Sequence, residues 1–331
     1  MASFLTNHRL AGELRDRFER AAAELGLRFD VVSLPAGGRR VEDGELDRIE
    51  LAFYPGDFTS DAGLTRSFLG GALRAAKLRW MQLPNAGVDH PVFARLLERG
   101  VRLSTGSGAA AEPIAQTVVG AMLSLARGFP AWSDAQRRHA WEPRLGDRSP
   151  RDLKGQCAVI VGLGPIGRNI ARLLKVLEMR TVGVRRSAEP VPDCDRVIAY
   201  ADLPGVLPEA DWLILCCPAS PVTRGIANEA VFAAMPKGSQ FINVSRGEIA
   251  VEKDVIAALQ NGHLAGAYLD VFEREPLDPA SPLWDMPNVL ISPHTASHSL
   301  GQNEAIFGIF LENLARFRAG EKLRNDVDDL G

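Results

Sequence analysis

Short apolar runs alternate along the chain with stretches that have helical spacing. In the N-terminal third, apolar runs at residues 27–32, 49–54 and 78–83 predict strands, and the stretches at 10–25 and 64–76 predict helices. Strands that alternate with helices are typical of a parallel sheet covered by helices. This third lacks a glycine-rich turn of the nucleotide-binding type, so we do not expect it to hold a cofactor.

The same alternation continues through the second half of the chain. Helices are predicted at 113–127, which leads into this region, and at 303–317, whose apolar face needs a partner surface. Between them the pattern predicts six strands, at 158–161, 180–184, 212–216, 239–244, 265–269 and 289–291. Six strands with intervening helices match a doubly wound domain. The expected fold class is therefore α/β, with two doubly wound parallel-sheet domains of the Rossmann or flavodoxin type.

Composition narrows the functional classes. The chain has 331 residues, 46% of them hydrophobic and 24% charged, with a net charge of −3. No basic patch dominates and no apolar run reaches the ~18 residues of a membrane-spanning helix, so neither nucleic acid nor membrane is an expected partner. The N-terminus lacks a signal-peptide pattern, which favours a cytoplasmic location. The four cysteines lack metal-ligand spacing, so free thiols and no bound metal are expected.

A glycine-rich turn at residues 162–167 follows the apolar run at 157–161 and precedes a helix-like stretch at 168–174. In such a turn the first glycine permits the tight bend, the second lets the backbone approach a pyrophosphate, and the third allows close helix packing. The helix N-terminus adds oriented N–H groups. The alternative is an ordinary glycine turn. We expect a dinucleotide to be bound by Gly162, Leu163, Gly164, Pro165, Ile166 and Gly167.

The next predicted strand bears on the choice of cofactor. An NAD site usually has Asp or Glu about 20 residues after the glycines, where it binds the ribose 2′-hydroxyl. This chain has Arg185, Arg186 and Ser187 there instead. Guanidinium groups pair with phosphate oxygens, so these residues suit a 2′-phosphate. NADP(H) is the preferred cofactor and NAD(H) the alternative, and solvated loop charges are the non-functional interpretation.

Three further segments complete a recognisable set of motifs. They are FINVSRG at 241–247, LDVFEREPL at 269–277 and ISPHTAS at 291–297. Together with the glycine turn they make the chain resemble the D-isomer-specific 2-hydroxyacid dehydrogenase family, and in particular its glyoxylate/hydroxypyruvate reductase branch. The resemblance extends from about residue 78 to the C-terminus.

The resemblance implies a domain organisation. The dinucleotide-binding domain, residues 106–297, would be inserted into a substrate domain made of residues 1–105 and 298–331, with the active site in the cleft between them. The last helix would then return to the N-terminal half. Related reductases reach across a twofold dimer with an aromatic-bearing arm, and Trp132 and Trp141 are the candidate contacts here. A homodimer is therefore expected.

By the same resemblance, Arg246 is the substrate arginine, His294 the acid/base and Glu275 its partner. An arginine can hold the carboxylate of a 2-oxo acid and stabilise charge on its carbonyl oxygen. A histidine can donate the proton that reduction requires, and a neighbouring carboxylate favours its imidazolium form and fixes the ring. Oxidation requires the neutral imidazole, so the two directions should have opposite pH preferences.

The residues alone leave alternatives open for this trio. Arg246 could be a charge at a helix start, and Glu275 could belong to a solvated run of charges. Two other histidines compete with His294. His298 would share a helix face with His294 if that segment were helical, and His90 stands beside an aspartate.

The resemblance also assigns binding positions. The loop Asn85, Ala86 and Gly87 would receive the substrate carboxylate on backbone N–H groups, whereas a plain turn is the competing interpretation. Asp270 would orient the nicotinamide carboxamide, or act only as a turn carboxylate. The full set assigned to the cofactor outside the glycine turn and the arginines is Thr117, Cys217, Pro218, Val244, Ser245, Asp270 and His294.

The expected function is reduction of a small 2-oxo acid, like glyoxylate or hydroxypyruvate, to the D-2-hydroxy acid. Two alternatives remain at this stage. A phosphite dehydrogenase-like enzyme keeps the same arginine, glutamate and histidine. A corepressor-like protein that senses NAD(H) shares the architecture, although the chain lacks a long tail of disordered composition for recruiting partners.

Overall fold

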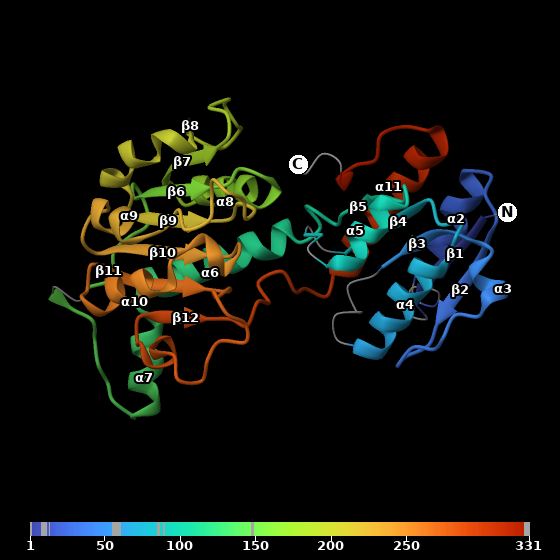
Figure 1. The fold of residues 1–331 in the computed structure, drawn as a ribbon. Helices are drawn as coiled ribbons and strands as arrows, with labels where there is room; N and C mark the ends of the chain where they lie inside the picture. The colour runs from blue at the N-terminus through green and yellow to red at the C-terminus, as the bar shows by residue number, and fades with distance from the viewer. Residues whose placement is uncertain are drawn as a thin grey trace. The chain divides into compact units, whose positions relative to one another are not determined.

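The computed structural model describes residues 2–7, 12, 14–54, 61–84, 87–88, 90–146 and 149–327. The chain forms two compact units (Figure 1). Unit 1 comprises Met1–Ala110 and Ser299–Gly331, and unit 2 comprises Ala111–His298. Each unit is a parallel α/β layer structure, so the predicted fold class is confirmed.

Unit 1 contains a five-stranded parallel sheet with the strand order β2-β1-β3-β4-β5. The inner strand β1 and the edge strand β5 were not predicted from the sequence. The strands are β1 (Ala2–Asn7), β2 (Phe29–Leu34), β3 (Ile49–Phe53), β4 (Trp80–Gln82) and β5 (Arg102–Ser104).

Helices cover both faces of this sheet. One apolar cluster joins the strands to α4 (Ala62–Arg74) and α5 (Pro91–Glu98), and another joins the opposite face to α2 (Arg15–Glu24) and α11 (Gln302–Ala319). A short helix, α3 (Asp43–Leu46), precedes β3. In α11, the Phe310 ring lies 4.9 Å from that of Phe53 and 5.3 Å from that of Trp80. The C-terminal helix thus completes the core of unit 1.

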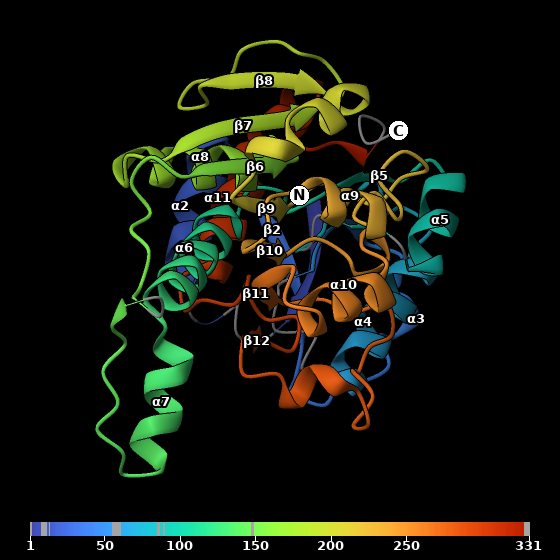
Figure 2. The ribbon, with the colours of Figure 1, turned by 90° about the vertical axis from the view of Figure 1, so that its left-hand side faces the viewer.

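Unit 2 contains a seven-stranded parallel sheet with the order β12-β11-β10-β9-β6-β7-β8. In Figure 2 these strands follow one another from β8 at the top to β12 at the bottom. The chain runs outward from β6 to β8, then crosses back to β9 and runs outward to β12. The strands are β6 (Cys157–Val161), β7 (Arg180–Arg185), β8 (Arg196–Ala199), β9 (Trp212–Leu215), β10 (Ser239–Asn243), β11 (Leu264–Leu269) and β12 (Val289–Ile291). Ligands in such sheets bind outside the carboxyl ends of the strands, near the reversal between β6 and β9.

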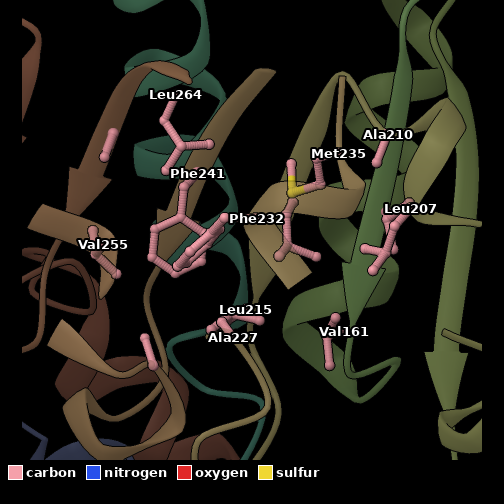
Figure 3. Packing of buried hydrophobic residues seen from close by; sticks show 14 of the residues in the cluster. Val161, Leu207, Ala210, Leu215, Ala227, Phe232, Met235, Phe241, Val255 and Leu264 are labelled. Carbon is pink, nitrogen blue, oxygen red and sulfur yellow. The ribbon is translucent and has the colours of Figure 1, made fainter. Parts of the chain in front are cut away.

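The helices of unit 2 also cover both faces of its sheet, with α6 and α8 on one side and α9 and α10 on the other (Figure 2). Central strands are buried on both faces and are therefore continuously apolar, as in β6 and β9. Figure 3 shows the Phe232 and Phe241 rings meeting in this core, with their centroids 5.2 Å apart. The helices are α6 (Ala111–Arg127), α7 (Phe129–Arg137), α8 (Pro165–Val176), α9 (Glu229–Ala234) and α10 (Glu252–Gln260), with shorter turns η3 (Tyr200–Gly205), η4 (Leu207–Glu209), η5 (Gly247–Ile249) and η6 (Pro282–Asp285).

Candidate functional site

Two glycines of the turn at residues 162–167, hereafter the glycine turn, are required by the packing of the chain itself. Gly162 has φ +108°, and a Cβ there would lie 2.7 Å from the Cys217 Cα. A Cβ on Gly167 would lie 1.9 Å from the Gly162 carbonyl oxygen. No side chain can occupy either place without moving backbone. The first and third glycines therefore fix the contact between β6, α8 and the strand end at Cys217.

Gly164 differs from these two glycines. It is exposed, and a Cβ there would meet no atom within 4 Å. It is the N-cap of α8, contributes no side-chain cap, and is followed by Pro165 at the first helical position. The first N–H groups of a helix have no partner within it and attract negative charge. The open space at Gly164 and these N–H groups fit a pyrophosphate, since nothing in the fold itself requires a glycine there.

The basic residues after β7 lie next to the glycine turn. The Gly162 N–H donates to the Val184 carbonyl at 2.8 Å, which joins the two strand ends directly. Arg185 ends β7 and is half-buried, and Arg186 is exposed. The ten residues 179–188 include no Asp or Glu. This strand end can therefore receive a phosphate and has no carboxylate for a ribose 2′-hydroxyl.

The strand end after β9 brings two cysteines to the same turn. The Cys216 thiol donates to the Gly162 carbonyl at 3.1 Å. Cys217 is buried, and its sulfur accepts a hydrogen bond from the Tyr200 hydroxyl. Burial raises the pKa of the Cys217 thiol to about 11, so this thiol stays neutral. Pro218, the next residue, is exposed. A neutral, weakly polar wall of this kind suits packing against an adenosine ring.

The loop after β10 carries Arg246 and is held by a buried amide. The Asn243 Oδ1 accepts the Ser245 N–H at 3.1 Å and the Ser245 hydroxyl at 2.7 Å, and the Asn243 Nδ2 donates to the Arg246 carbonyl at 3.1 Å. Val244 is buried in the same loop. No role for Asn243 was predicted from the sequence. Its position as a polar residue at the end of an apolar strand could have indicated that it binds the following loop.

The loop that carries Arg246 and Gly247 packs directly against the loop after β11, which contains Phe272. A Cβ on Gly247 would lie 1.9 Å from the Phe272 carbonyl carbon, so only glycine allows the approach. The Arg246 guanidinium is half-buried and donates to the Ser245 carbonyl at 2.8 Å. Arg246 therefore lies on a loop in contact with the segment that carries Glu275.

Glu275 and His294 are brought together. The His294 Nδ1 lies 2.7 Å from the Glu275 Oε2, and the Glu275 Oε1 accepts the Phe272 N–H at 3.1 Å. A carboxylate only accepts hydrogen bonds, so the imidazole must carry a proton on Nδ1. The Nε2 atom is then left for a reactant. Both side chains remain accessible, with exposed fractions of 46% for His294 and 37% for Glu275.

Asp270 holds the segment that carries His294, residues 292–296, hereafter the histidine loop. This carboxylate is only 3% exposed, and its Oδ1 accepts the Ser292 hydroxyl at 2.5 Å, the Thr295 N–H at 2.8 Å and the Ala296 N–H at 3.1 Å. The Asp270 carbonyl also accepts the His294 N–H at 2.8 Å. Whatever it contributes to a cofactor, Asp270 fixes the backbone on both sides of His294.

Helix α6 contacts the histidine loop through Thr117. Its hydroxyl oxygen lies 3.0 Å from the Pro113 carbonyl oxygen and 3.4 Å from that of Ala296. Thr117 thus links α6 to the histidine loop. Of the predicted substrate loop, Gly87 is half-buried in unit 1, whereas Asn85 and Ala86 lie outside the described residues.

The structure bears on both histidines that compete with His294, namely His298 and His90. Residues 293–301 are not helical, so the premise that His298 and His294 share a helix face was wrong. The left-handed backbone of His294, with φ +55°, interrupts any helix there. The His90 Nδ1 accepts the Val92 N–H at 3.2 Å and caps α5, which is a structural role.

Within the described ranges, no cluster of His, Cys, Asp or Glu side chains could hold a metal ion. In the same part of the chain, no helix has the length and apolar character to cross a membrane. All four cysteines are free, with Cys157 and Cys217 buried and Cys194 and Cys216 half-buried.

Comparisons with known proteins agree on one family. Residues 119–296 match the model described as "D-isomer specific 2-hydroxyacid dehydrogenase, NAD binding domain". Glyoxylate/hydroxypyruvate reductase B of Klebsiella pneumoniae is 33% identical over 256 residues, which cover 76% of this chain and 79% of that protein.

Two solved structures resemble the whole chain. A D-isomer specific 2-hydroxyacid dehydrogenase from Xanthobacter autotrophicus, in complex with NADPH, has a TM-score of 0.74 at 29% identity and covers 99% of this chain and 98% of its own. An NADPH-dependent glyoxylate/hydroxypyruvate reductase from Sinorhizobium meliloti, in complex with NADP and sulfate, has a TM-score of 0.73 at 28% identity and covers 100% of this chain and 99% of its own.

Proposed function

The chain belongs to the D-isomer specific 2-hydroxyacid dehydrogenases, and on that premise we propose that it uses NADPH to reduce a small 2-oxo acid to the D-2-hydroxy acid. Substrates of the glyoxylate and hydroxypyruvate kind are named for relatives that match three quarters of the chain or more. The observation that carries the proposal is the 2.7 Å contact between His294 and Glu275 in the unit that also holds the glycine turn.

The glycine turn would hold the cofactor. Its pyrophosphate would lie at Gly164 and the first turn of α8, where the backbone is open and the N–H groups are unpaired within the helix. Cys217 and Pro218 would line the adenosine side. Arg185, Arg186 and Ser187 would bind a 2′-phosphate, which favours NADP(H) over NAD(H). When bound, the reduced nicotinamide supplies the hydride.

The groups of this chain would supply the proton and hold the substrate. His294 carries a proton on Nδ1 towards Glu275, so in the imidazolium form its Nε2 donates to the carbonyl oxygen as the alcohol forms. Arg246 binds the substrate carboxylate as a fixed positive charge, helped by the backbone of residues 85–87. Thr117, Val244, Ser245 and Asp270 complete the nicotinamide side, together with His294.

We assign the two units different roles. Residues 106–297 form the dinucleotide-binding domain, because the glycine turn and the strand ends around it belong to this segment. Residues 1–105 and 298–331 form the substrate domain, which contains the five-stranded sheet and whose sequence has no glycine turn of this pattern. Limited proteolysis that releases an intact segment spanning these bounds and still binding NADPH tests the assignment. Loss of NADPH binding with an intact segment would contradict it.

We also propose a homodimer formed through α7 and the segment that follows it. This part extends away from the rest of unit 2 in Figures 1 and 2. Trp132 is 40% exposed and Trp141 is 97% exposed, and Phe129 adds a further exposed ring. Aromatic side chains exposed on an arm gain most when a partner buries them. Sedimentation should give twice the 35.9 kDa mass of the chain, and a monomer at micromolar concentration would contradict the dimer.

The functional proposal is tested by following NADPH oxidation with glyoxylate, hydroxypyruvate and longer 2-oxo acids, and then repeating the series with NADH. We expect turnover with at least one of these acids, a higher kcat/KM with NADPH, and product of the D configuration. Tight cofactor binding without turnover of any acid would support a sensing protein instead. Reduction of the oxidised cofactor by phosphite would support the phosphite dehydrogenase alternative. The cytoplasmic location stays a prediction.

A further inference from the structure

In the histidine loop, the backbone of His294 has a left-handed conformation that residues other than glycine seldom adopt. His294 has φ +55°, in the left-handed region, which is unfavourable for a residue with a side chain and is kept only where the surroundings impose it. Strained residues of this kind persist at functional sites when neighbouring hydrogen bonds over-determine them. The groups that hold His294 in place therefore influence where its imidazole lies.

Asp270 supplies those hydrogen bonds. Its carboxylate accepts the N–H groups of Thr295 and Ala296, at 2.8 and 3.1 Å, and its carbonyl accepts the His294 N–H at 2.8 Å. Three consecutive N–H groups are thus bound to one residue at the end of β11. Asp270 therefore binds the backbone of the residue whose imidazole Nδ1 lies 2.7 Å from Glu275.

A chain of two hydroxyl groups lies behind this carboxylate. The Ser292 hydroxyl donates to the Asp270 Oδ1 at 2.5 Å, and the Tyr268 hydroxyl lies 2.7 Å from the Ser292 oxygen. Serine has one hydroxyl proton and gives it to the carboxylate, so the Tyr268 hydroxyl must donate to Ser292. Tyr268 is 4% exposed, and burial raises its pKa to about 12, so it remains a donor across the working pH range.

We infer that Tyr268, acting through Ser292 and Asp270, is a positioning residue for His294. Strand β11 fixes Tyr268 by its parallel pairing with β12, where Tyr268 stands opposite Leu290. The rigid sheet thereby sets the orientation of Ser292, which orients the carboxylate that binds the histidine loop. This inference rests on the proposed acid/base role of His294, but the hydrogen bonds from Tyr268 to Ala296 can be tested without any activity.

The test uses matched substitutions in the full-length protein. Tyr268→Phe and Ser292→Ala each remove one hydroxyl group of the chain, and Ser292→Thr keeps it at a half-buried position. Ser239→Ala is the control, because the Ser239 hydroxyl is buried on β10 without a hydrogen-bond partner in the described part of the chain. For each variant we would measure kcat, KM, the Kd of NADPH and the thermal midpoint.

Tyr268→Phe and Ser292→Ala should each lower kcat on the order of tenfold, because misplaced acid/base groups lose rate while substrate binding persists. Their KM and the NADPH Kd should stay within about twofold. The double variant should be no slower than Ser292→Ala, because both substitutions break the same chain. Ser292→Thr and Ser239→Ala should retain the wild-type kcat. An unchanged kcat in Tyr268→Phe, or an equal loss in Ser239→Ala, would overturn the inference.

Amide hydrogen exchange separates this inference from the proposed function. Exchange at Thr295 and Ala296 should be faster in Tyr268→Phe and Ser292→Ala than in the wild type, and unchanged in Ser239→Ala. If the wild type reduced no 2-oxo acid, faster exchange would still support the chain of hydrogen bonds and only the proposed function would fail. Unchanged exchange in both variants would overturn the inference whatever the activity.

Discussion

The glycine turn and the histidine loop lie at strand ends of the same sheet, but different forces hold them. In the glycine turn, backbone fills the places where side chains would be, as at Gly162 and Gly167. In the histidine loop, one buried carboxylate, Asp270, binds a hydroxyl and successive N–H groups. The glycine turn therefore requires residues without a Cβ atom. The histidine loop requires hydrogen-bond donors placed around one carboxylate.

The two regions therefore tolerate different kinds of substitution. A turn fixed by contact between backbone atoms excludes even a single methyl group, because the backbone must move to admit it. A loop fixed by buried hydrogen bonds tolerates changes of size but not the loss of a donor or acceptor, because an unpaired buried polar group is costly. Substitutions in the two regions should therefore separate cofactor binding from catalysis.

The largest expected effect is on catalysis alone. His294→Ala should lower kcat for reduction by about 10² to 10⁴, because the proton donor is lost while the glycine turn is untouched. The Kd of NADPH, measured by fluorescence titration, should stay within about threefold. Near-normal turnover in this variant would remove His294 from the mechanism.

The next effect separates the glycines from one another. Gly167→Ala should destabilise the protein by about 1–3 kcal/mol, since the new methyl group would overlap the Gly162 carbonyl. Gly164→Ala should leave the thermal midpoint unchanged, because its Cβ meets no atom within 4 Å, yet weaken NADPH binding by more than about tenfold. Equal NADPH affinity in Gly164→Ala and the wild type would show that the pyrophosphate lies elsewhere.

A smaller effect concerns the choice of cofactor. Arg185→Ala should weaken NADPH binding by about fivefold to tenfold and leave the Kd of NADH nearly unchanged, because only the 2′-phosphate loses a charge-assisted hydrogen bond. Arg180→Ala is the control, since it removes the same charge from the exposed amino end of β7. A similar loss of affinity for both cofactors would reduce the role of Arg185 to general electrostatics.

The smallest effect is on the pH dependence. Reduction needs the imidazolium, so its rate should fall as the pH rises, and oxidation needs the neutral ring, so its rate should fall as the pH decreases. Glu275→Gln replaces the carboxylate that accepts the hydrogen bond of the His294 Nδ1 by a neutral amide, so the imidazole is held less firmly and reduction near neutral pH should slow a few-fold. Equal reduction rates in the variant and the wild type would separate Glu275 from proton transfer.

The two regions also differ in how far sequence could predict them. The glycine turn is local, and steric requirements place its glycines at fixed spacing after an apolar strand, so its position could be predicted. The proximity of Glu275 and His294 could be expected only from the order of motifs in the resembling family. The hydrogen bonds from Asp270 to Ala296 span 26 residues, and no local pattern indicates them.

The strands β1, β5 and β8 were not predicted from the sequence, and two of them, β8 and β1, have the same explanation. In β8, Arg196 is exposed and the other three residues are only half-buried, because the strand lies at an edge of the sheet. β1 is an inner strand, but it contains polar residues such as Thr6 and Asn7, which are buried in the sheet. Burial of polar residues is decided by neighbours distant in sequence, so the apolar periodicity is weak at both strands.

The decisive experiment is a crystal structure of the protein with oxidised cofactor and oxamate, an unreactive analogue of a 2-oxo acid. We predict that the His294 Nε2 lies about 2.6–3.2 Å from the carbonyl oxygen of the analogue and that Arg246 binds its carboxylate. We also predict that the pyrophosphate of the cofactor lies at Gly164. An analogue bound away from His294 and Arg246 would contradict the proposed chemistry.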